Sequence, residues 1–226
     1  MARKWLVAFL VVIALLVGQA PAHAVPSLFL SDGTTSVTIV DGGPGDLSPT
    51  VGLVLFSGSV GSWEFNVSTG VSDPVFGPPF PHMDLNSIDI NSAGSATSLT
   101  VMFTDTDFAS FTGDLAATIG GTIGSGGSLS YDVFVDAGNA PFGLTTLAFS
   151  VGPFGPGAFA GSDSGAVSLG SPFSVTQRVI LGPVSNPSSQ SYNAELQPVP
   201  VLVPEPASLL LLGGGLMGIA LPRRRS

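Results

Sequence analysis

Apolar residues recur at every second position along most of the chain between its two ends. Trp63, Phe65 and Val67, for example, are separated by single polar residues. The same spacing relates further sets, namely Leu99, Val101 and Phe103; Tyr131, Val133 and Val135; Leu147, Phe149 and Val151; Phe173 and Val175; and Val179 and Leu181. A period of two is that of half-buried strands, and no stretch between the ends keeps a 3.6-residue period for three turns. The pattern therefore predicts an all-β fold.

Clusters of Gly and Pro separate these runs and predict short turns. We expect an antiparallel β-sandwich of jelly-roll or Ig-like type with roughly 8 to 11 strands over residues 25–197. Residues 51–56 are apolar on both faces, which predicts a central strand. Residues 57–61 then predict a hairpin turn into the strand of Trp63.

Charge and cysteine content exclude several classes of protein. The 226 residues include 15 acidic residues, 6 basic residues and no Cys. Between residues 25 and 203 there are 14 acidic residues and one basic residue, Arg178. Nucleic-acid binding is excluded because it needs Lys and Arg to neutralise phosphates. Without Cys, disulfides, Cys-ligated zinc and thiol nucleophiles are excluded as well.

The N-terminus has the pattern of a secretory signal peptide. Arg3 and Lys4 precede an apolar run over residues 6–17, and Ala22 and Ala24 form an A-x-A cleavage site. An apolar run this short does not span a hydrocarbon core of about 30 Å. We therefore expect signal peptidase to remove residues 1–24.

The C-terminus has a second pattern in three parts. Residues 198–206 are a Pro-rich linker that ends in Pro204, Glu205 and Pro206. Residues 207–221 carry no charge and predict a short hydrophobic helix, and Arg223, Arg224 and Arg225 follow it. The Arg cluster is expected to stay cytoplasmic. The apolar part reaches only about 22 Å as a helix, which suits transient residence in the inner membrane better than a permanent anchor.

In these last residues the chain resembles the PEP-CTERM proteins, which are exported by Gram-negative bacteria. The resemblance implies recognition by an exosortase, a membrane enzyme that cleaves near the motif. Pro204, Glu205 and Pro206 would form the recognition element, and Arg223 to Arg225 the stop-transfer charges. It also implies a cell-surface or extracellular location in biofilm and exopolysaccharide. The alternative is an ordinary tail anchor in which Pro204 and Pro206 only stop the helix.

No catalytic constellation is predicted, so we expect a protein that is not an enzyme. His82, Asp105 and Ser164 have the chain order of a chymotrypsin-like triad, but a triad is defined by geometry, and the residues around Ser164 suit a polar turn. Glycoside hydrolysis needs two carboxylates a few Å apart. Glu64 with Asp132 or Asp136 is the pair considered, although pairs arise by chance among so many acidic residues.

Two further candidate sites lie in the region between the two terminal segments. Asp105 and Asp107, with Asp114 nearby, are the best candidates for a calcium site, because Ca²⁺ prefers several oxygen ligands. The alternative is that these aspartates end a strand and face water. No other cofactor is predicted: the Gly-rich run over residues 120–128 lacks the Lys of a P-loop and is expected to be a flexible loop.

Polysaccharide is the expected ligand if the sandwich binds one. Trp63 is in phase with core residues, so the candidates for exposed stacking platforms are the loop residues Phe76, Phe80 and Phe154. We therefore expect an exported structural or adhesive matrix protein. The alternative is a polysaccharide-binding or polysaccharide-degrading sandwich that uses the same sorting signal.

Overall fold

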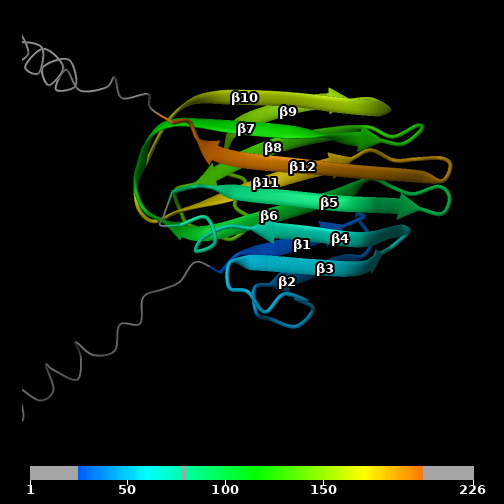
Figure 1. Ribbon diagram of the computed structural model, residues 1–226, viewed down its shortest axis with the longest axis horizontal. Coiled ribbons are helices and arrows are strands. Elements are labelled where there is room, and N and C mark those ends of the chain that lie inside the picture. The colour runs from blue at the N-terminus through cyan, green and yellow to red at the C-terminus, as the bar shows by residue number, and fades with distance from the viewer. Residues whose placement is uncertain (1–24, 78–79, 201–226) are drawn as a thin grey trace, which may run out of the picture.

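The computed structural model describes residues 25–77 and 80–200, which form two six-stranded antiparallel sheets packed face to face (Figure 1). We call them sheet A and sheet B. Sheet A has the strand order β2 (Ser36–Val40), β1 (Ser27–Ser31), β6 (Leu99–Phe108), β11 (Phe173–Leu181), β8 (Leu129–Asp136) and β9 (Thr146–Phe154). Sheet B has the order β10 (Gly157–Leu169), β7 (Phe111–Ile123), β12 (Ser188–Pro198), β5 (Met83–Ser92), β4 (Trp63–Val71) and β3 (Leu53–Val60). The predicted sandwich is confirmed.

The alternating apolar residues supply the core between the sheets. Val101 and Phe103 of β6 and Val179 of β11 are fully buried, and so is Trp63 of β4, whose Nε1 donates to the Thr97 carbonyl at 2.9 Å. Most of the predicted apolar sets therefore point inward. The exceptions are Val67, which is half-buried, and Leu147, which is 53% exposed. Leu147 lies beyond a shift in the β8–β9 register, where a strand changes the face that its side chains occupy.

Gln177 of β11 provides a polar link between the sheets. Its Nε2 donates to the Tyr131 hydroxyl of β8 at 2.7 Å, and it approaches the Met83 and Ala194 carbonyls of sheet B at 3.4 and 3.5 Å. All four residues are buried, and a hydrogen bond offsets the free-energy cost of removing a polar group from water. The Gln177 side chain thus joins β8 and β11 to β5 and β12.

Three local predictions were wrong. Residues 51–56 do not form a central strand, because β3 is an edge strand of sheet B. A loop covers that edge: Leu47 N donates to the Leu55 carbonyl, and Leu55 N donates to the Asp46 carboxylate, both at 2.9 Å. The hairpin into β4 is confirmed, with Val60 opposite Trp63, but its turn is confined to residues 61 and 62, because residues 57–60 belong to β3.

The other two errors concern Gly-rich segments. Residues 120–123 belong to β7 and not to a loop, and the predicted polar turn around Ser164 lies inside β10. Glycine weakens a strand but allows another chain to come close. The Gly121 backbone faces Tyr192 of β12 on one side and Phe159 of β10 on the other. Twelve strands result, one more than the upper expectation.

Candidate functional site

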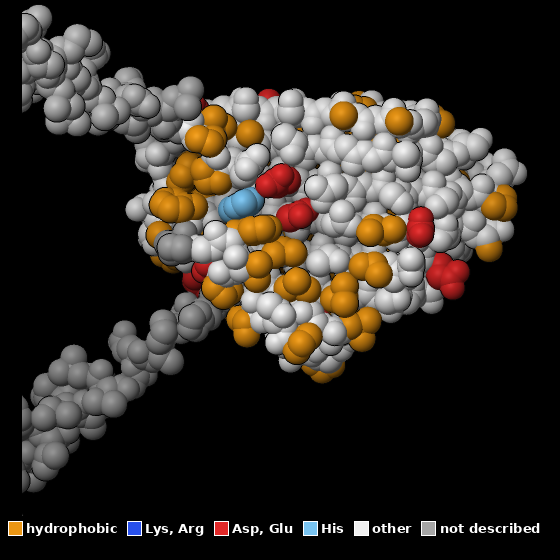
Figure 2. All heavy atoms as spheres, in the orientation of Figure 1, with side chains coloured by type: hydrophobic (Ala, Val, Ile, Leu, Met, Phe, Trp, Pro, Cys, Tyr) orange, Lys and Arg blue, Asp and Glu red, His pale blue; other side chains and the backbone are white. Residues whose placement is uncertain are grey.

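Sheet B presents a cluster of titratable side chains on its outer face. It comprises His82, which comes just before β5, Asp84 of β5 and Glu195 of β12, and we call it the acid–histidine cluster. Asp84 and Glu195 are opposite each other in the β5–β12 ladder, so their side chains project to the same face. His82 Nε2 lies 3.0 Å from Glu195 Oε1. In Figure 2 the His side chain lies beside acidic side chains near one end of the sheet.

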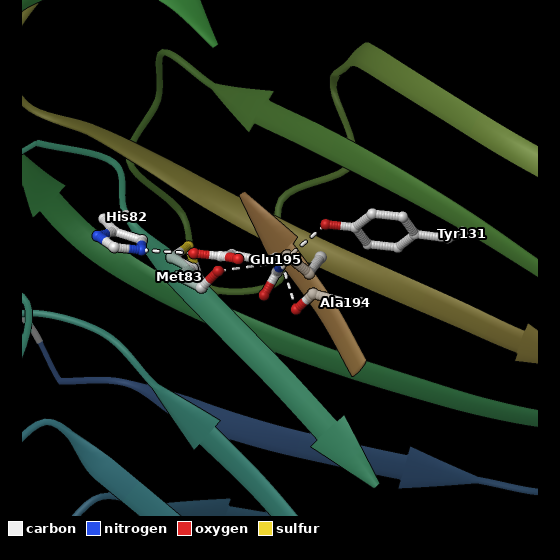
Figure 3. Close-up of polar contacts among 6 residues, drawn as sticks. His82, Met83, Tyr131, Ala194 and Glu195 are labelled. Carbon is white, nitrogen blue, oxygen red and sulfur yellow. Dashed lines mark hydrogen bonds and ion pairs between the residues drawn. The ribbon is translucent and has the colours of Figure 1, made fainter. Parts of the chain in front are cut away.

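Aromatic residues lie at the border of this cluster. The Phe76 ring stacks on the His82 ring with centroids 4.0 Å apart and an interplanar angle of 15°. Phe76 is 39% exposed and Phe80 is 57% exposed. β5, which begins just after His82, and β12, which carries Glu195, are the strands whose Met83 and Ala194 carbonyls the Gln177 side chain of sheet A approaches (Figure 3). The cluster is therefore built on strands that a buried contact joins to the opposite sheet.

The environment of Asp84 favours its neutral form. Burial, and to a smaller extent the negative charge of Glu195, raise the pKa of this carboxyl to about 6, while His82 opposes the shift. Asp84 Oδ1 is buried and has no hydrogen-bond partner among the described residues. An acid next to a carboxylate and an exposed aromatic ring can bond the hydroxyl groups of a sugar and stack on its apolar face.

The residues that the sequence analysis considered for a triad and for acidic pairs do not come together. His82 contacts Glu195, Asp105 is fully buried, and Ser164 lies exposed on β10. Glu64 projects from sheet B, whereas Asp132 and Asp136 belong to sheet A. The carboxylates that do meet are Asp84 and Glu195, which the strand register brings together.

Asp132 and Asp136 have structural partners instead. Arg178 Nη2 donates to Asp132 Oδ2 at 2.7 Å, and the Arg178 guanidinium carbon lies 4.6 Å from the centre of the Phe134 ring. The Asp136 carboxylate accepts from the backbone of Gly138 and Ala140 in the loop after β8. The Asp132–Arg178 pair therefore joins β8 to β11, and the Asp136 contacts stabilise the turn after β8.

The predicted calcium ligands are also separated. Asp105 Oδ2 accepts from the Ser72 hydroxyl at 2.6 Å, whereas Asp107 Oδ1 accepts from the Asn139 amide at 2.7 Å. Asp114 lies exposed on β7 in the other sheet. Over residues 25–77 and 80–200, no three His or acidic side chains are placed to hold a metal ion. The set Asp105, Asp107 and Asp114 therefore does not form one site in this structure.

Asp105 gives the fold a pH dependence. Burial raises its pKa from 3.8 to about 7, and the hydrogen bonds from Ser72 and Thr106 oppose the shift only in part. Between these two pH values the folded state holds a proton that the unfolded state has lost. The contribution of Asp105 to the free energy of unfolding therefore falls as pH rises from about 4 to about 7.

We expect Asp105→Asn to stabilise the protein at pH 8, by an amount on the order of a few kcal/mol, and to have little effect at pH 4. Urea unfolding at the two pH values measures this difference. Asp114→Asn removes the same charge from an exposed position and should not change the dependence on pH. An equal effect of Asp105→Asn at both pH values would show that ionisation of this carboxyl is not the cause.

The comparisons with known proteins identify the C-terminal signal. The family model described as the PEP-CTERM protein-sorting motif matches residues 202–225. The chain therefore carries this motif, which implies exosortase-dependent export to the cell envelope or surface. Pro204, Glu205, Pro206 and Arg223 to Arg225 fall within the match.

Wider similarity is slight. No curated protein matches the chain. Among solved structures, an isomalto-dextranase of Arthrobacter globiformis T6, complexed with panose, is similar at 10% sequence identity and a TM-score of 0.26. The match covers 63% of this chain and 23% of that chain. A TM-score this low supports no inference from that protein.

The predicted terminal segments lie outside the described residues. These are the signal peptide with Ala22 and Ala24, the hydrophobic helix over residues 207–221 and the Arg cluster. Within the part of the chain that the structure does describe, we find no helix with the length and apolar character needed to cross a membrane.

Proposed function

We propose that this protein is a structural or adhesive component of an exopolysaccharide or biofilm matrix, and that it is not an enzyme. In this proposal, signal peptidase removes residues 1–24 and an exosortase processes the C-terminal tail after transient anchoring in the inner membrane. The observation that carries the proposal is the sorting motif at residues 202–225, which follows closely on the last strand, β12, ending at Pro198. This order leaves the sandwich on the exported side of the motif.

The chemistry of the sandwich supports a role outside the cell. Its residues 25–203 carry 14 acidic side chains against one basic side chain, which favours solubility and hydration in a polysaccharide gel. The residues considered for a protease triad, His82, Asp105 and Ser164, have separate partners or positions. The all-β core without Cys gains its stability from packing.

Intact mass and cellular location test the proposal. We expect the protein to lose both terminal segments and to reach the surface or medium in a host that contains the exosortase. Without the exosortase it should keep its tail and remain in the membrane fraction. Retention of the tail in both hosts would instead indicate an ordinary tail anchor.

A second candidate function is polysaccharide binding at the acid–histidine cluster, which is favoured by the exposed Phe76 ring stacked on His82, the partner of Glu195. Flat aromatic rings and carboxylates are groups that contact sugars. The same site would serve in polysaccharide degradation, which an assay for release of reducing ends would detect.

If this second function is correct, Phe76→Ala should weaken retention of the protein on its own matrix polysaccharide by about 2- to 10-fold, because one stacking contact is lost. Affinity electrophoresis in a gel containing the polysaccharide measures the change. Leu144→Ala removes another exposed apolar side chain, 42% exposed, and should leave retention unchanged. Equal retention of the Phe76 variant and the wild type would exclude the cluster as the binding site.

A further inference from the structure

Three of the four edge strands of the sandwich are protected against pairing with another chain. β2 has only five residues, and short edge strands offer little to pair with. The loop of Asp46 and Leu47 covers β3. β9 contains Pro153 and two shifts of register against β8. Each of these is a device that natural sheets use to prevent edge-to-edge association.

The fourth edge, β10, has none of these features. It spans Gly157–Leu169, pairs with β7 over all 13 residues without a shift, and contains no Pro. It lies at the edge of sheet B (Figure 1). Its outward side chains are small and exposed, namely Ala158, Ala160, Ser162, Ser164, Ala166 and Ser168. A long regular edge of this kind can accept a further strand.

The sequence of β10 indicates which strand that would be. Residues 160–166 read Ala-Gly-Ser-Asp-Ser-Gly-Ala, which is the same in both directions around Asp163. On either side, Phe159 and Val167 continue the match as two apolar residues. In an antiparallel pair related by a two-fold axis through Asp163, each residue therefore faces its own kind. A self-complementary surface is what a two-fold symmetric interface requires.

The contacts within one chain explain only part of this symmetry. A Cβ at Gly161 would lie 2.7 Å from Phe154 and Val151, so packing against β9 requires Gly there. A Cβ at Gly165 would meet only Phe149, at 3.7 Å, which is ordinary contact. The outward residues Ala160, Ser162, Ser164 and Ala166 are exposed, so the core does not dictate their order.

We propose that β10 is a self-association edge, at which a second copy of this chain adds its own β10 in antiparallel register with residue 160 opposite residue 166. The two six-stranded B sheets then form one continuous sheet. This inference is independent of the proposed function, since it rests on the edge and sequence of β10 alone.

Asp163 limits the strength of the association. It is the one charged residue of β10, and the symmetry places the two Asp163 residues opposite each other. Like charges in directly opposed positions of a sheet repel. Its carboxylate also accepts from its own chain, at 2.9 Å from Ser164 N and 3.3 Å from Ser150 N of β9. Pairing is therefore expected to be reversible and to strengthen at higher salt.

Cross-linking of the full-length exported chain tests the register, because the natural chain has no Cys. Ala160→Cys and Ala166→Cys variants with different tags are produced together and treated with a short bis-maleimide. We expect a covalent dimer that contains both tags. Ala160→Cys produced alone is the matched control and should give little dimer, since two copies of residue 160 would lie about 20 Å apart at about 3.3 Å per residue.

Two results would overturn the proposal. Equal yields from the mixed and single variants would show association without this register, as would be expected if the hydrophobic tails alone drove it. No dimer in any combination would show that β10 does not pair. Neither result depends on whether the exosortase cleaves the tail.

Asp163→Asn provides the second measurement. It removes the opposed charges and keeps a side-chain acceptor for Ser164 N. In the mixed cross-linking experiment it should lower the concentration needed for half-maximal dimer by about 3- to 10-fold. Asp89→Asn makes the same change at an exposed position on β5 and should have no effect. An unchanged or higher half-maximal concentration with Asp163→Asn would contradict the placement of the two-fold axis.

Discussion

Replacing Glu205 by Ala should leave the sandwich folded and leave the precursor uncleaved in the membrane fraction. Glu205 lies in the matched sorting motif, beyond the last residue of β12, Pro198, so its side chain is not part of the described core. Loss of the one carboxylate in the Pro-Glu-Pro element removes the charged group that the exosortase would recognise. We expect most of the protein to change from the processed to the unprocessed mass.

Intact mass spectrometry of the membrane and secreted fractions measures this change. Pro200→Ala is the matched control, because it alters the same linker outside the matched residues and should be processed normally. The double variant Pro204→Ala and Pro206→Ala should behave like the Glu205 variant. Normal processing of the Glu205 and double-Pro variants would mean that the Pro-Glu-Pro element is not the signal.

The second large effect is expected at Gly121 in the middle of sheet B. A Cβ at this position would overlap the Ser191 carbonyl oxygen and lie 2.8 Å from the Tyr192 Cα. Both are backbone atoms of β12, which is paired on both sides and has no free space into which to move. Gly121→Ala should therefore lower the free energy of unfolding by about 3 kcal/mol, the upper part of the range for overpacked sites.

Its neighbour Gly120 is the control. A Cβ there would lie 3.5 Å from the Phe159 carbonyl oxygen, which is ordinary contact, so Gly120→Ala should change stability by less than about 1 kcal/mol in either direction. Urea unfolding followed by tryptophan fluorescence compares the two variants, since Trp63 is buried in the core. Similar stabilities for both would mean that β12 can move away from β7.

The glycine pair shows why part of the fold was not predictable. Residues 120–128 are rich in Gly, and such a composition is typical of loops when neighbours are unknown. The need for Gly at position 121 arises from β12, about 70 residues later in the chain, which comes too close for any side chain. Residues 51–56 are a similar case, since the edge position of β3 depends on which strands and loops lie beside it.

The candidate site, too, could be predicted from the sequence only in part. The sequence indicated Phe76, Phe80 and Phe154 as exposed aromatic residues. The structure confirms that Phe76 and Phe80 are exposed, whereas Phe154 is half-buried and packs against the core. The sequence did not indicate that Asp84 and Glu195 face each other, because that depends on the register of β5 against β12. The alternation of Tyr192, Ala194 and Leu196 predicts only that Glu195 points outward.

The all-β class, most of the inward-facing residues of β4, β6, β8, β9 and β11, and the sorting signal at the C-terminus could be predicted from the sequence. These are local properties: a strand period covers a few residues, and a sorting motif is recognised as a contiguous segment. Which strands are neighbours, which edge stays open and which titratable groups meet depend on the three-dimensional packing of the sandwich. The chain crosses repeatedly between the two sheets, so each of these features joins residues far apart in sequence, and packing across the whole sandwich sets them.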